Sequence, residues 1–376
     1  MTTESKHTTA APEKLPKPRA PRPWTVVWTI VGAAIIVLIV ANARRGAVSD
    51  RIRNPEVTGA PRPVKFLFGY QHWIDVWHGF TVVLMIVLIV GFIVLWRRYP
   101  KHPYLIMALV TSIIVWQDPI MNWAPFAVYD PMLWHYPEDF PWAAISPTVE
   151  PFICFGYVAF QFGPFFAANA ILRRLQSRRS PESFVWRHPL ISLGGLLFVV
   201  GFLVDMLVEI PCVTTGLYIY SQVPPVGSIF VGKPWQFPLI WESSLVTLVM
   251  IAAGVLVYRD DTGKTVAEKL ANRAKLFPTK PALGTFIVML VIVNLAYFLY
   301  GAAFMTIKAT KFASSVACPW PYPDSKVYDP QGFYEKNGQP GPYFDGVWAT
   351  WASGQPDGRP SVKLPAGGGR CAPHNQ

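Results

Sequence analysis

The stretch LISLGGLLFVVGFLVDMLVEI, residues 190–210, decides the fold of this chain. As an α-helix it would be about 30 Å long, which matches the hydrocarbon core of a bilayer. Its only charged residues are Asp205 and Glu209, which are four positions apart and therefore share one helical face. The stretch predicts a membrane-crossing helix with a carboxylate pair, and charges inside a span are costly and usually functional.

Six further apolar segments have the length or composition of membrane spans. With 52% hydrophobic and 15% charged residues, the 376-residue chain is unlike a set of soluble domains. The predicted fold class is all-α, a polytopic transmembrane bundle of about seven helices. The third segment is short, so we expect it to be tilted or extended. The predicted spans are 24–43, 76–96, 104–116, 152–172, 190–210, 239–258 and 283–305.

The distribution of Lys and Arg predicts the orientation, because these residues mark the short cytoplasmic loops of membrane proteins. With the N-terminus inside, the four inner segments hold 19 of them, and the outer loops 117–151 and 211–238 hold one. The outer loop 44–75 disagrees, with six. We expect a disordered cytoplasmic tail at 1–23, a transmembrane domain at 24–305 and an extracytoplasmic Pro/Gly-rich tail at 306–376. The protein is then a multi-pass protein of the cell membrane.

The cysteines and the net charge agree with this arrangement. Cys318 and Cys371 both lie in the predicted outer tail, where disulfides persist, so a bridge between them is predicted, with two unpaired thiols as the alternative. The net charge of +11 comes from short basic runs beside apolar segments, which suits anionic lipid. The chain has no basic stripe with interleaved aromatic residues, so a nucleic-acid partner is not predicted.

Carboxylates from four predicted helices fall at the outer level of the membrane: Asp118, Glu150, the Asp205/Glu209 pair and Glu242. Glu150 precedes a proline and Glu242 follows Pro238 in a first turn, so capping and the helix dipole are one explanation for both, and a functional role is the alternative. Asp118, Asp205 and Glu209 lie towards the C-termini of spans, where the dipole disfavours negative charge. A carboxyl pair in a poorly solvated place retains a proton, which gives a neutral acid beside an anion.

The outer loops between these helices are rich in aromatic residues, which form interfacial belts or the walls of a cleft for an apolar ligand. Gln117, Asn122, Tyr218 and Tyr220 would orient such a ligand, with Trp235 beside it.

A weaker group is His72, Asp75 and His78, at the outer start of the second span. These side chains could bind a metal or act as bases. The chain has seven histidines, two of them in terminal tails and two in predicted inner loops, which is too few for a histidine-rich di-iron site. We therefore predict neither a metal nor another cofactor. The Gly263-Lys264-Thr265 run lacks the upstream glycine and strand of a phosphate loop and is interpreted as a solvated linker.

These motifs together resemble the membrane-bound AveC-type spirocyclase family over about residues 70–320, most clearly in the second half. The resemblance rests on the Asp205/Glu209 helix, Gly216-x-Tyr218-x-Tyr220, Phe237-Pro238-Leu239 with Glu242, the segment YRDDTGKT at 258–265 with Glu268, Gln117-Asp118-Pro119 and Glu150-Pro151. The family's founding activity closes a dihydroxyketone into a spiroketal, in one case with dehydration.

The resemblance implies cofactor-independent acid–base cyclisation or dehydration of a lipophilic, polyketide- or lipid-like polyol or ketone. Asp205 and Glu209 would be the acid and the stabilising anion, with Glu242 or Asp118 as base. Two alternatives stay open: an accessory or lipid-binding protein that uses the same cleft without turnover, and a transporter, which the lack of an inverted repeat disfavours. The substrate-binding residues would be Glu150, Gln117, Asn122, Tyr218, Tyr220, Trp235, His72 and His78.

Overall fold

The computed structural model describes residues 67–125, 127–129, 133, 156–220, 222–310, 312–313 and 315–316, with five helical positions between 30 and 41. The chain divides into two units, Met1–Asn42 and Ala43–Gln376, and every element below belongs to the second. Glu150, Cys318 and Cys371 lie outside the described residues, as do residues 1–23, so the predictions made for them remain predictions.

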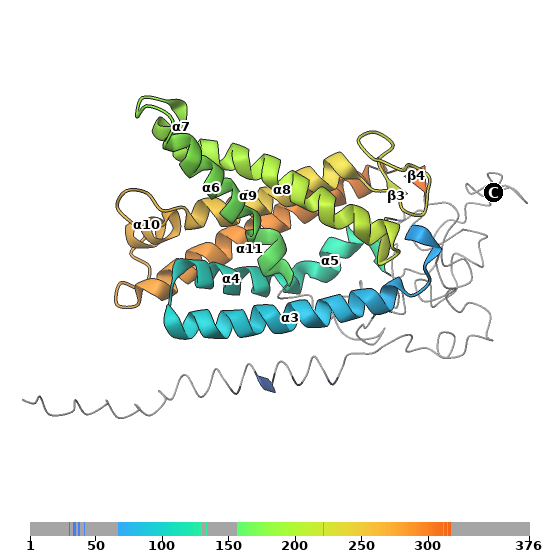
Figure 1. Cartoon of the computed structure of the whole chain (residues 1–376), viewed down its shortest axis with the longest axis horizontal. Helices are drawn as coiled ribbons and strands as arrows, with labels where there is room; N and C mark the ends of the chain where they lie inside the picture. The colour runs from blue at the N-terminus through green and yellow to red at the C-terminus, as the bar shows by residue number, and fades with distance from the viewer. Residues whose placement is uncertain are drawn as a thin grey trace, which may run out of the picture. The chain divides into compact units, whose positions relative to one another are not determined.

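Among the described residues, five helices are long and apolar enough to cross a membrane. They correspond to the predicted spans 76–96, 104–116, 190–210, 239–258 and 283–305. The chain is therefore mostly helical with the character of a membrane protein, while the count of seven spans remains a prediction. The five are α3 (Trp73–Arg98), the run Pro103–Asn122, α8 (Pro189–Thr214), α9 (Leu239–Val257) and α11 (Pro281–Ala309) (Figure 1).

The short third span is extended at its C-terminal end. Its helix α4 (Pro103–Ile113) continues through the 3₁₀ turn η2 (Ile114–Gln117) into α5 (Asp118–Trp123). Asp118 therefore lies in the first turn of α5 and not at the C-terminus of a helix. The prediction that the helix dipole opposes this carboxylate is wrong, because the helical run continues past Asp118 to Trp123 and the dipole effect falls off within the last turn.

The helix of the carboxylate pair also runs past its predicted end. α8 continues through Pro211 to Thr214, so Glu209 lies more than a turn before its last residue. Since the dipole effect falls off within the last turn, it bears little on either Asp205 or Glu209. The dipole therefore explains the position of neither carboxyl group, and that of Glu209 follows instead from a cavity that its side chain lines.

The fourth predicted span is described only from residue 156 onwards and is not among the five membrane-length helices. Its described part contains a π-helical turn, η5 (Val158–Phe162), followed by α6 (Pro164–Gln176). Pro164 has no N–H to give to the preceding turn, which allows the helix to widen there. Gly163 permits the close approach, because a Cβ at that position would lie 2.1 Å from the Ala159 carbonyl oxygen.

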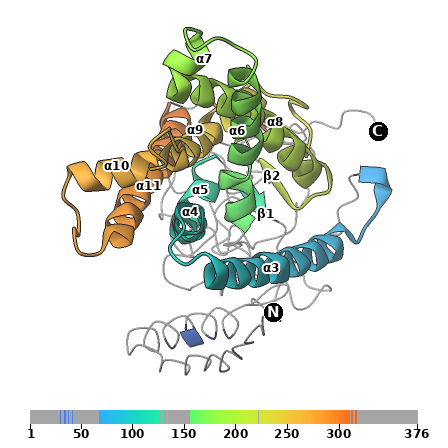
Figure 2. The same ribbon diagram turned by 60° about the vertical axis from the view of Figure 1, so that its left-hand side comes forward.

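Small residues bring α8 and α9 close together. A Cβ on Gly201 of α8 would lie 2.8 Å from Met250 Sδ and 2.9 Å from Thr247 Cγ2 of α9. The helix α9 packs against α4, α6, α8 and α11 and lies in the middle of the group (Figure 2). In contrast, only 6% of the most apolar window of α3 is buried, and α3 runs along the edge of the described helices (Figure 2). An apolar surface of this extent is typical of a helix that contacts lipid or another protein surface.

Two short antiparallel sheets, which the all-α prediction did not include, lie at one end of the helices (Figure 1). β1 (Ala127–Tyr129) pairs with β2 (Tyr218–Tyr220), so that Ala127 faces Tyr220 and Tyr129 faces Tyr218. β3 (Gln222–Val223) pairs with β4 (Ser315–Val316). Each sheet joins segments far apart in the sequence and thereby fixes the loops that follow α5, α8 and α11.

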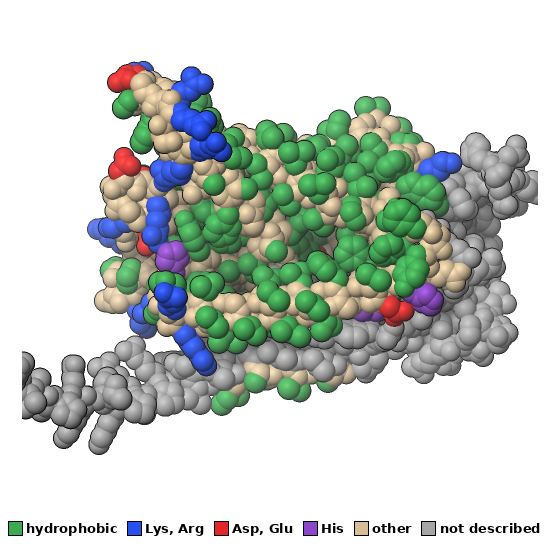
Figure 3. Space-filling view, in the orientation of Figure 1, with side chains coloured by type: hydrophobic (Ala, Val, Ile, Leu, Met, Phe, Trp, Pro, Cys, Tyr) green, Lys and Arg blue, Asp and Glu red, His purple; other side chains and the backbone are tan. Residues whose placement is uncertain are grey.

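Basic side chains gather at the opposite end. Figure 3 shows Lys and Arg side chains together over the end where Figure 1 places α7 (Phe184–Arg187) and α10 (Val266–Arg273). The strand-bearing end of the described molecule shows few such side chains in this view (Figure 3). The end with α7 and α10 therefore has the Lys and Arg content expected of an inner side, and the strand-bearing end has the content expected of an outer side.

Candidate active site

A small cavity lies where β1, β2, η5 and the adjoining ends of α5, α8, α9 and α11 meet. Its volume is about 60 Å³, enough for a few water molecules or the reacting end of a larger molecule. The wall is unusual for its chemistry, since it combines three carboxyl groups, two amides and six phenols. These polar residues are Asp118, Asn122, Tyr129, Tyr157, Gln161, Glu209, Tyr218, Tyr220, Glu242, Tyr297 and Tyr300.

Asp118 is the centre of the first polar group in the wall. Its Oδ1 accepts hydrogen bonds from the hydroxyls of Tyr157 and, at 3.5 Å, of Tyr297. Its Oδ2 accepts from Asn122 Nδ2 at 2.9 Å, one turn later in the same helical run. Asn122 Oδ1 in turn accepts from the Tyr129 hydroxyl at 3.4 Å. This carboxyl group is 2% exposed and accepts from Tyr157 and Asn122, while the one hydroxyl hydrogen of Tyr297 is shared between Asp118 and the Tyr157 hydroxyl at 3.2 Å.

Glu209 is the centre of the second group. Its Oε2 accepts hydrogen bonds from the hydroxyls of Tyr218 and, at 3.2 Å, of Tyr220. These two tyrosines alternate with Ile219 along β2, so the strand directs both phenols to one side and Ile219 to the hydrophobic core. Burial first, and then the charge of Glu209, raise the pKa of Tyr218 and of Tyr220 well above the usual value. Both phenols therefore keep their protons and act as donors.

Glu242 has one engaged and one available oxygen. Its Oε1 accepts from the Tyr300 hydroxyl at 2.6 Å, whereas its Oε2 is buried and has no hydrogen-bond partner among the described residues. The residue lies in the first turn of α9, as predicted, but its side chain bonds to α11 and not to the backbone of its own helix. Capping alone therefore does not account for it.

Asp205 is fully buried and does not form part of the cavity wall. It lies within electrostatic reach of Glu209 and Glu242 and beside Ser243. Neither of its carboxyl oxygens has a hydrogen-bond partner within the described part of the chain. The predicted pair is thus divided between two positions, with Glu209 at the cavity surface and Asp205 one turn away in the packed interior.

Gln161 is a wall residue that sequence reasoning missed. It lies in the π-helical turn, is 1% exposed, and neither Nε2 nor Oε1 has a partner among the described residues. A buried amide with both ends unpaired costs free energy, and π-turns occur frequently at functional sites. Its only sequence signal is the following Gly163-Pro164, which sets up the turn.

Tyr157, Tyr297 and Tyr300 were also missed, because tyrosines within apolar runs resemble ordinary span residues. The spacing of three between Tyr297 and Tyr300 places both on one face of α11, and their rings stack at 5.6 Å. That spacing was the available signal.

Four of the predicted binding residues lie away from the cavity. The side-chain amide of Gln117 donates to the backbone and side-chain oxygens of Asn294, and so joins η2 to α11. Trp235 packs against a hydrophobic cluster near the strands, and His78 is buried on α3. His72 is exposed, with Nδ1 3.6 Å from Asp75 Oδ2.

The structure gives no support to the metal alternative in the ranges that it describes. There, no group of three or more His, Cys, Asp or Glu residues is arranged to hold a metal ion.

Five membrane-length helices, four of which contribute to a partly open cavity of carboxyl groups and phenols, define the class: a polytopic helical membrane protein with a polar site. A family model described as "Spirocyclase AveC-like" matches residues 96–328, and the chain belongs to this family. The resemblance predicted from the motifs is thereby confirmed. Comparisons with curated proteins and with solved structures gave no match.

Proposed function

We propose that this protein is a membrane-embedded enzyme of the spirocyclase or dehydratase type, which works by carboxyl acid–base chemistry without a redox cofactor. The substrate is a lipophilic polyol or ketone whose reacting end enters the cavity. One observation carries the proposal: Asp118, Glu209 and Glu242 come from three helices and line one small, partly open cavity whose other polar walls are phenols and amides. Membership of the spirocyclase family supports the same reaction class.

The hydrogen bonds suggest a division of labour among the carboxyl groups. Glu209 and Asp118 each accept from at least two donors, an environment that favours a carboxylate anion. Glu242 has an oxygen without a donor and is therefore suited to carry a proton on Oε2 and deliver it. Asp205 is a positioning residue in this scheme, because its charge or proton acts on Glu209 and Glu242 without reaching the cavity.

The reaction balances with these groups alone. A dihydroxyketone closes to a hemiketal when one of its hydroxyls adds to the carbonyl. Glu242 donates a proton to the hemiketal hydroxyl, which leaves as water, and the oxocarbenium ion that forms is stabilised by the Glu209 carboxylate. The second hydroxyl attacks this ion, and its proton passes to Asp118. The products are the spiroketal and one water molecule, and proton exchange between the carboxyl groups restores the enzyme.

Gln161 completes the proposed site as a substrate-positioning residue. Its amide N–H is available to a substrate carbonyl and its amide oxygen to a substrate hydroxyl. The substrate would thus satisfy an amide that has no partner in the described structure. The remainder of a larger substrate extends beyond the cavity, since about 60 Å³ holds only a fragment.

The proposed orientation has the N-terminus inside, the basic end of the molecule in the cytoplasm and the cavity towards the outer leaflet. The gathering of Lys and Arg at the end with α7 and α10 supports it (Figure 3). The tail from residue 306 is then extracytoplasmic.

The test is metabolite profiling of a deletion strain complemented with the wild-type chain or with a Glu209→Gln, Glu242→Gln double variant. A precursor that accumulates with the double variant and carries one more water than the wild-type product supports catalysis. Full complementation by the double variant rules it out. If the variant still binds the precursor and no turnover is seen even with the wild type, the protein is instead a lipid-binding accessory.

A further inference from the structure

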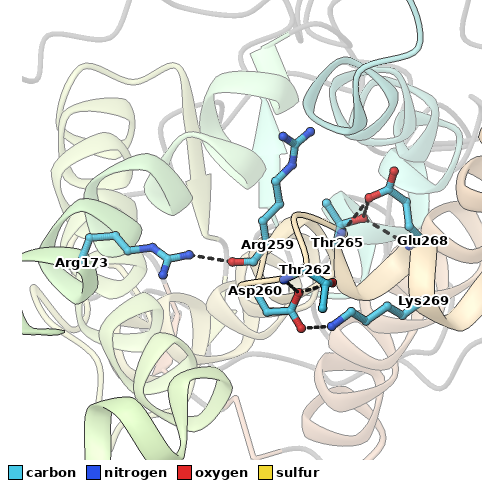
Figure 4. A network of polar contacts seen from close by, with 7 residues as sticks. All are labelled: Arg173, Arg259, Asp260, Thr262, Thr265, Glu268 and Lys269. Carbon is cyan, nitrogen blue, oxygen red and sulfur yellow. Dashed lines mark hydrogen bonds and ion pairs between the residues drawn. The ribbon is translucent and has the colours of Figure 1, made fainter. Parts of the chain in front are cut away.

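The segment that follows α9 is an ordered turn, contrary to the prediction of a solvated linker. Arg259 and Thr265 form a β-bridge, and Thr265 is fully buried. Asp260 Oδ1 accepts from the backbone N and the hydroxyl of Thr262, at 3.1 and 2.7 Å. Glu268 Oε2 accepts from the backbone N and the hydroxyl of Thr265, at 2.7 and 2.8 Å, in a capping box that begins α10 (Figure 4).

These contacts occupy the nearby carboxylates. The second oxygen of Asp260 forms an ion pair with Lys269, and Glu268 is committed to the cap (Figure 4). Arg173 Nη2 donates to the backbone oxygen of Arg259 at 2.6 Å, and its guanidinium lies 4.9 Å from the centre of the Tyr258 ring. The Arg259 guanidinium points away from Asp260 in Figure 4 and has no carboxylate partner in the described structure.

The Arg259 guanidinium is nevertheless fixed in place. It lies 5.8 Å from the centre of the Tyr104 ring, and its Nη2 is 3.0 Å from His102 Nε2. Its Nε is buried without a hydrogen-bond partner among the described residues. A positive group that is held rigidly, with a buried donor unused, is costly unless an acceptor is bound to it.

His102 makes the requirement for an acceptor more specific. It is the N-cap of α4, and its Nδ1 accepts from the backbone N of Tyr104 at 3.2 Å. Burial and the charge of Arg259 lower the pKa of His102, so the ring is neutral and has a single N–H. If Nδ1 accepts the cap bond, that hydrogen is on Nε2 and faces the Arg259 donor. Two donors then face each other across 3.0 Å. With the hydrogen on Nδ1 instead, Nε2 accepts from Arg259 but the cap bond from Tyr104 is lost, so one of the two contacts lacks its partner in either tautomer.

We propose that Arg259 and His102 form a binding site for a phosphate group, whose oxygens accept from the guanidinium and from His102 Nε2–H. An anion here satisfies the unused Nε–H, separates the two opposed donors and leaves the N-cap of α4 intact. Phosphate suits a guanidinium because its oxygens match two parallel N–H groups. The site lies at the start of α4 and just past the end of α9, opposite to the ends of these helical runs that line the cavity, where an anionic phospholipid headgroup or free phosphate would reach it.

The experiment uses the purified full-length chain in a neutral detergent and phosphate-free buffer. Thermal unfolding is followed while dioleoylphosphatidylglycerol, dioleoylglycerol or inorganic phosphate is titrated. A ligand that binds the folded state raises the Tm in a saturable manner, from which an apparent Kd follows. We expect saturable stabilisation by a phosphate-bearing ligand and none by dioleoylglycerol. Saturation by phosphatidylglycerol alone identifies a lipid headgroup as the source, and saturation by inorganic phosphate as well identifies free phosphate as a ligand.

Two variants test the site and one controls for charge. Arg259→Gln removes the guanidinium, and His102→Asn removes Nε2–H while it keeps a residue that caps helices well. Each should weaken the apparent Kd by about tenfold or more, as the loss of a charge-assisted hydrogen bond does. Arg178→Gln makes the same charge change at an exposed position and should leave the Kd within about twofold.

Three results would overturn the proposal. These are equal stabilisation by dioleoylglycerol, unchanged affinity in both site variants, and an equal loss in Arg178→Gln, which would indicate diffuse attraction to the basic end. If Arg259→Gln does not fold, His102→Asn decides the matter alone.

Discussion

Replacing Glu209 by Gln is the most direct test of the chemistry proposed for the cavity. The change removes a negative charge and keeps the shape of the side chain and one acceptor oxygen for Tyr218 and Tyr220. A carboxylate about 4 Å from a developing cation contributes about 4 kcal/mol at an effective dielectric constant of about 20. Loss of that amount from the transition state slows the reaction about 10³-fold. We expect the Tm to change little, since the two phenols keep a partner.

The assay measures the rate of product formation in membranes isolated from the complemented deletion strain, with the accumulated precursor as substrate. Asp75→Asn is the matched control, because it removes a carboxylate whose side chain is 52% exposed and lies away from the cavity wall. The control should retain the wild-type rate. A Glu209→Gln rate within about threefold of wild type, at equal protein level, would refute the assignment of Glu209 as the stabilising anion.

Three further predictions concern other parts of the molecule. Gln161→Leu should raise the Tm, because the buried amide without partners among the described residues destabilises the folded protein by about 1–3 kcal/mol. The same variant should lower product formation about tenfold. A lower Tm with normal activity would contradict the positioning role. Gly201→Val should destabilise the protein by about 1–3 kcal/mol in thermal unfolding, because α9 leaves no room for a side chain, whereas Gly195→Val, with nothing within 4 Å, should not. In lipid- and phosphate-free buffer the folded chain should lose stability as the pH falls below 6.5. Burial and the charge of Arg259 lower the pKa of His102 in the folded state, so the unfolded chain binds a proton at higher pH than the folded chain does. His102→Asn should remove this loss of stability, and a pH profile that the variant leaves unchanged would disprove the prediction.

Apolar length predicted most of the helices because it does not depend on what the helices pack against. The stretches around Asp205 and Glu242 are long enough to cross a bilayer, and both are helices in the structure. Helix ends were harder to predict, because they depend on local hydrogen bonding. The helical run passes through 3₁₀ geometry at Ile114–Gln117 and continues to Trp123, which places Asp118 before the last turn and removes the dipole argument for that residue.

The site was predictable only in part, because the cavity depends on how segments meet. Charge alone identified the carboxyl groups, since carboxylates in apolar runs are conspicuous. The phenols of Tyr157, Tyr297 and Tyr300 are not conspicuous in such runs, and their role became visible only from their bonds to Asp118 and Glu242. Composition also failed to predict the ordered turn after α9. Its polar residues indicated a solvated linker, but their side chains form hydrogen bonds with one another.

The pairing of β1 with β2 connects the hydrogen bonds around Asp118 with those around Glu209. Tyr129 reaches the Asp118 group through Asn122, and its ring lies 4.9 Å from that of Tyr218, which holds Glu209. A slip of one residue in β1 would turn Tyr129 to the opposite side and break its bond to Asn122, and the same slip in β2 would turn Tyr218 and Tyr220 away from Glu209. Insertions in the connecting loops leave the register unchanged, whereas a single-residue deletion within either strand does not. Variation among relatives in loop length is therefore compatible with one chemistry, and variation in strand length is not.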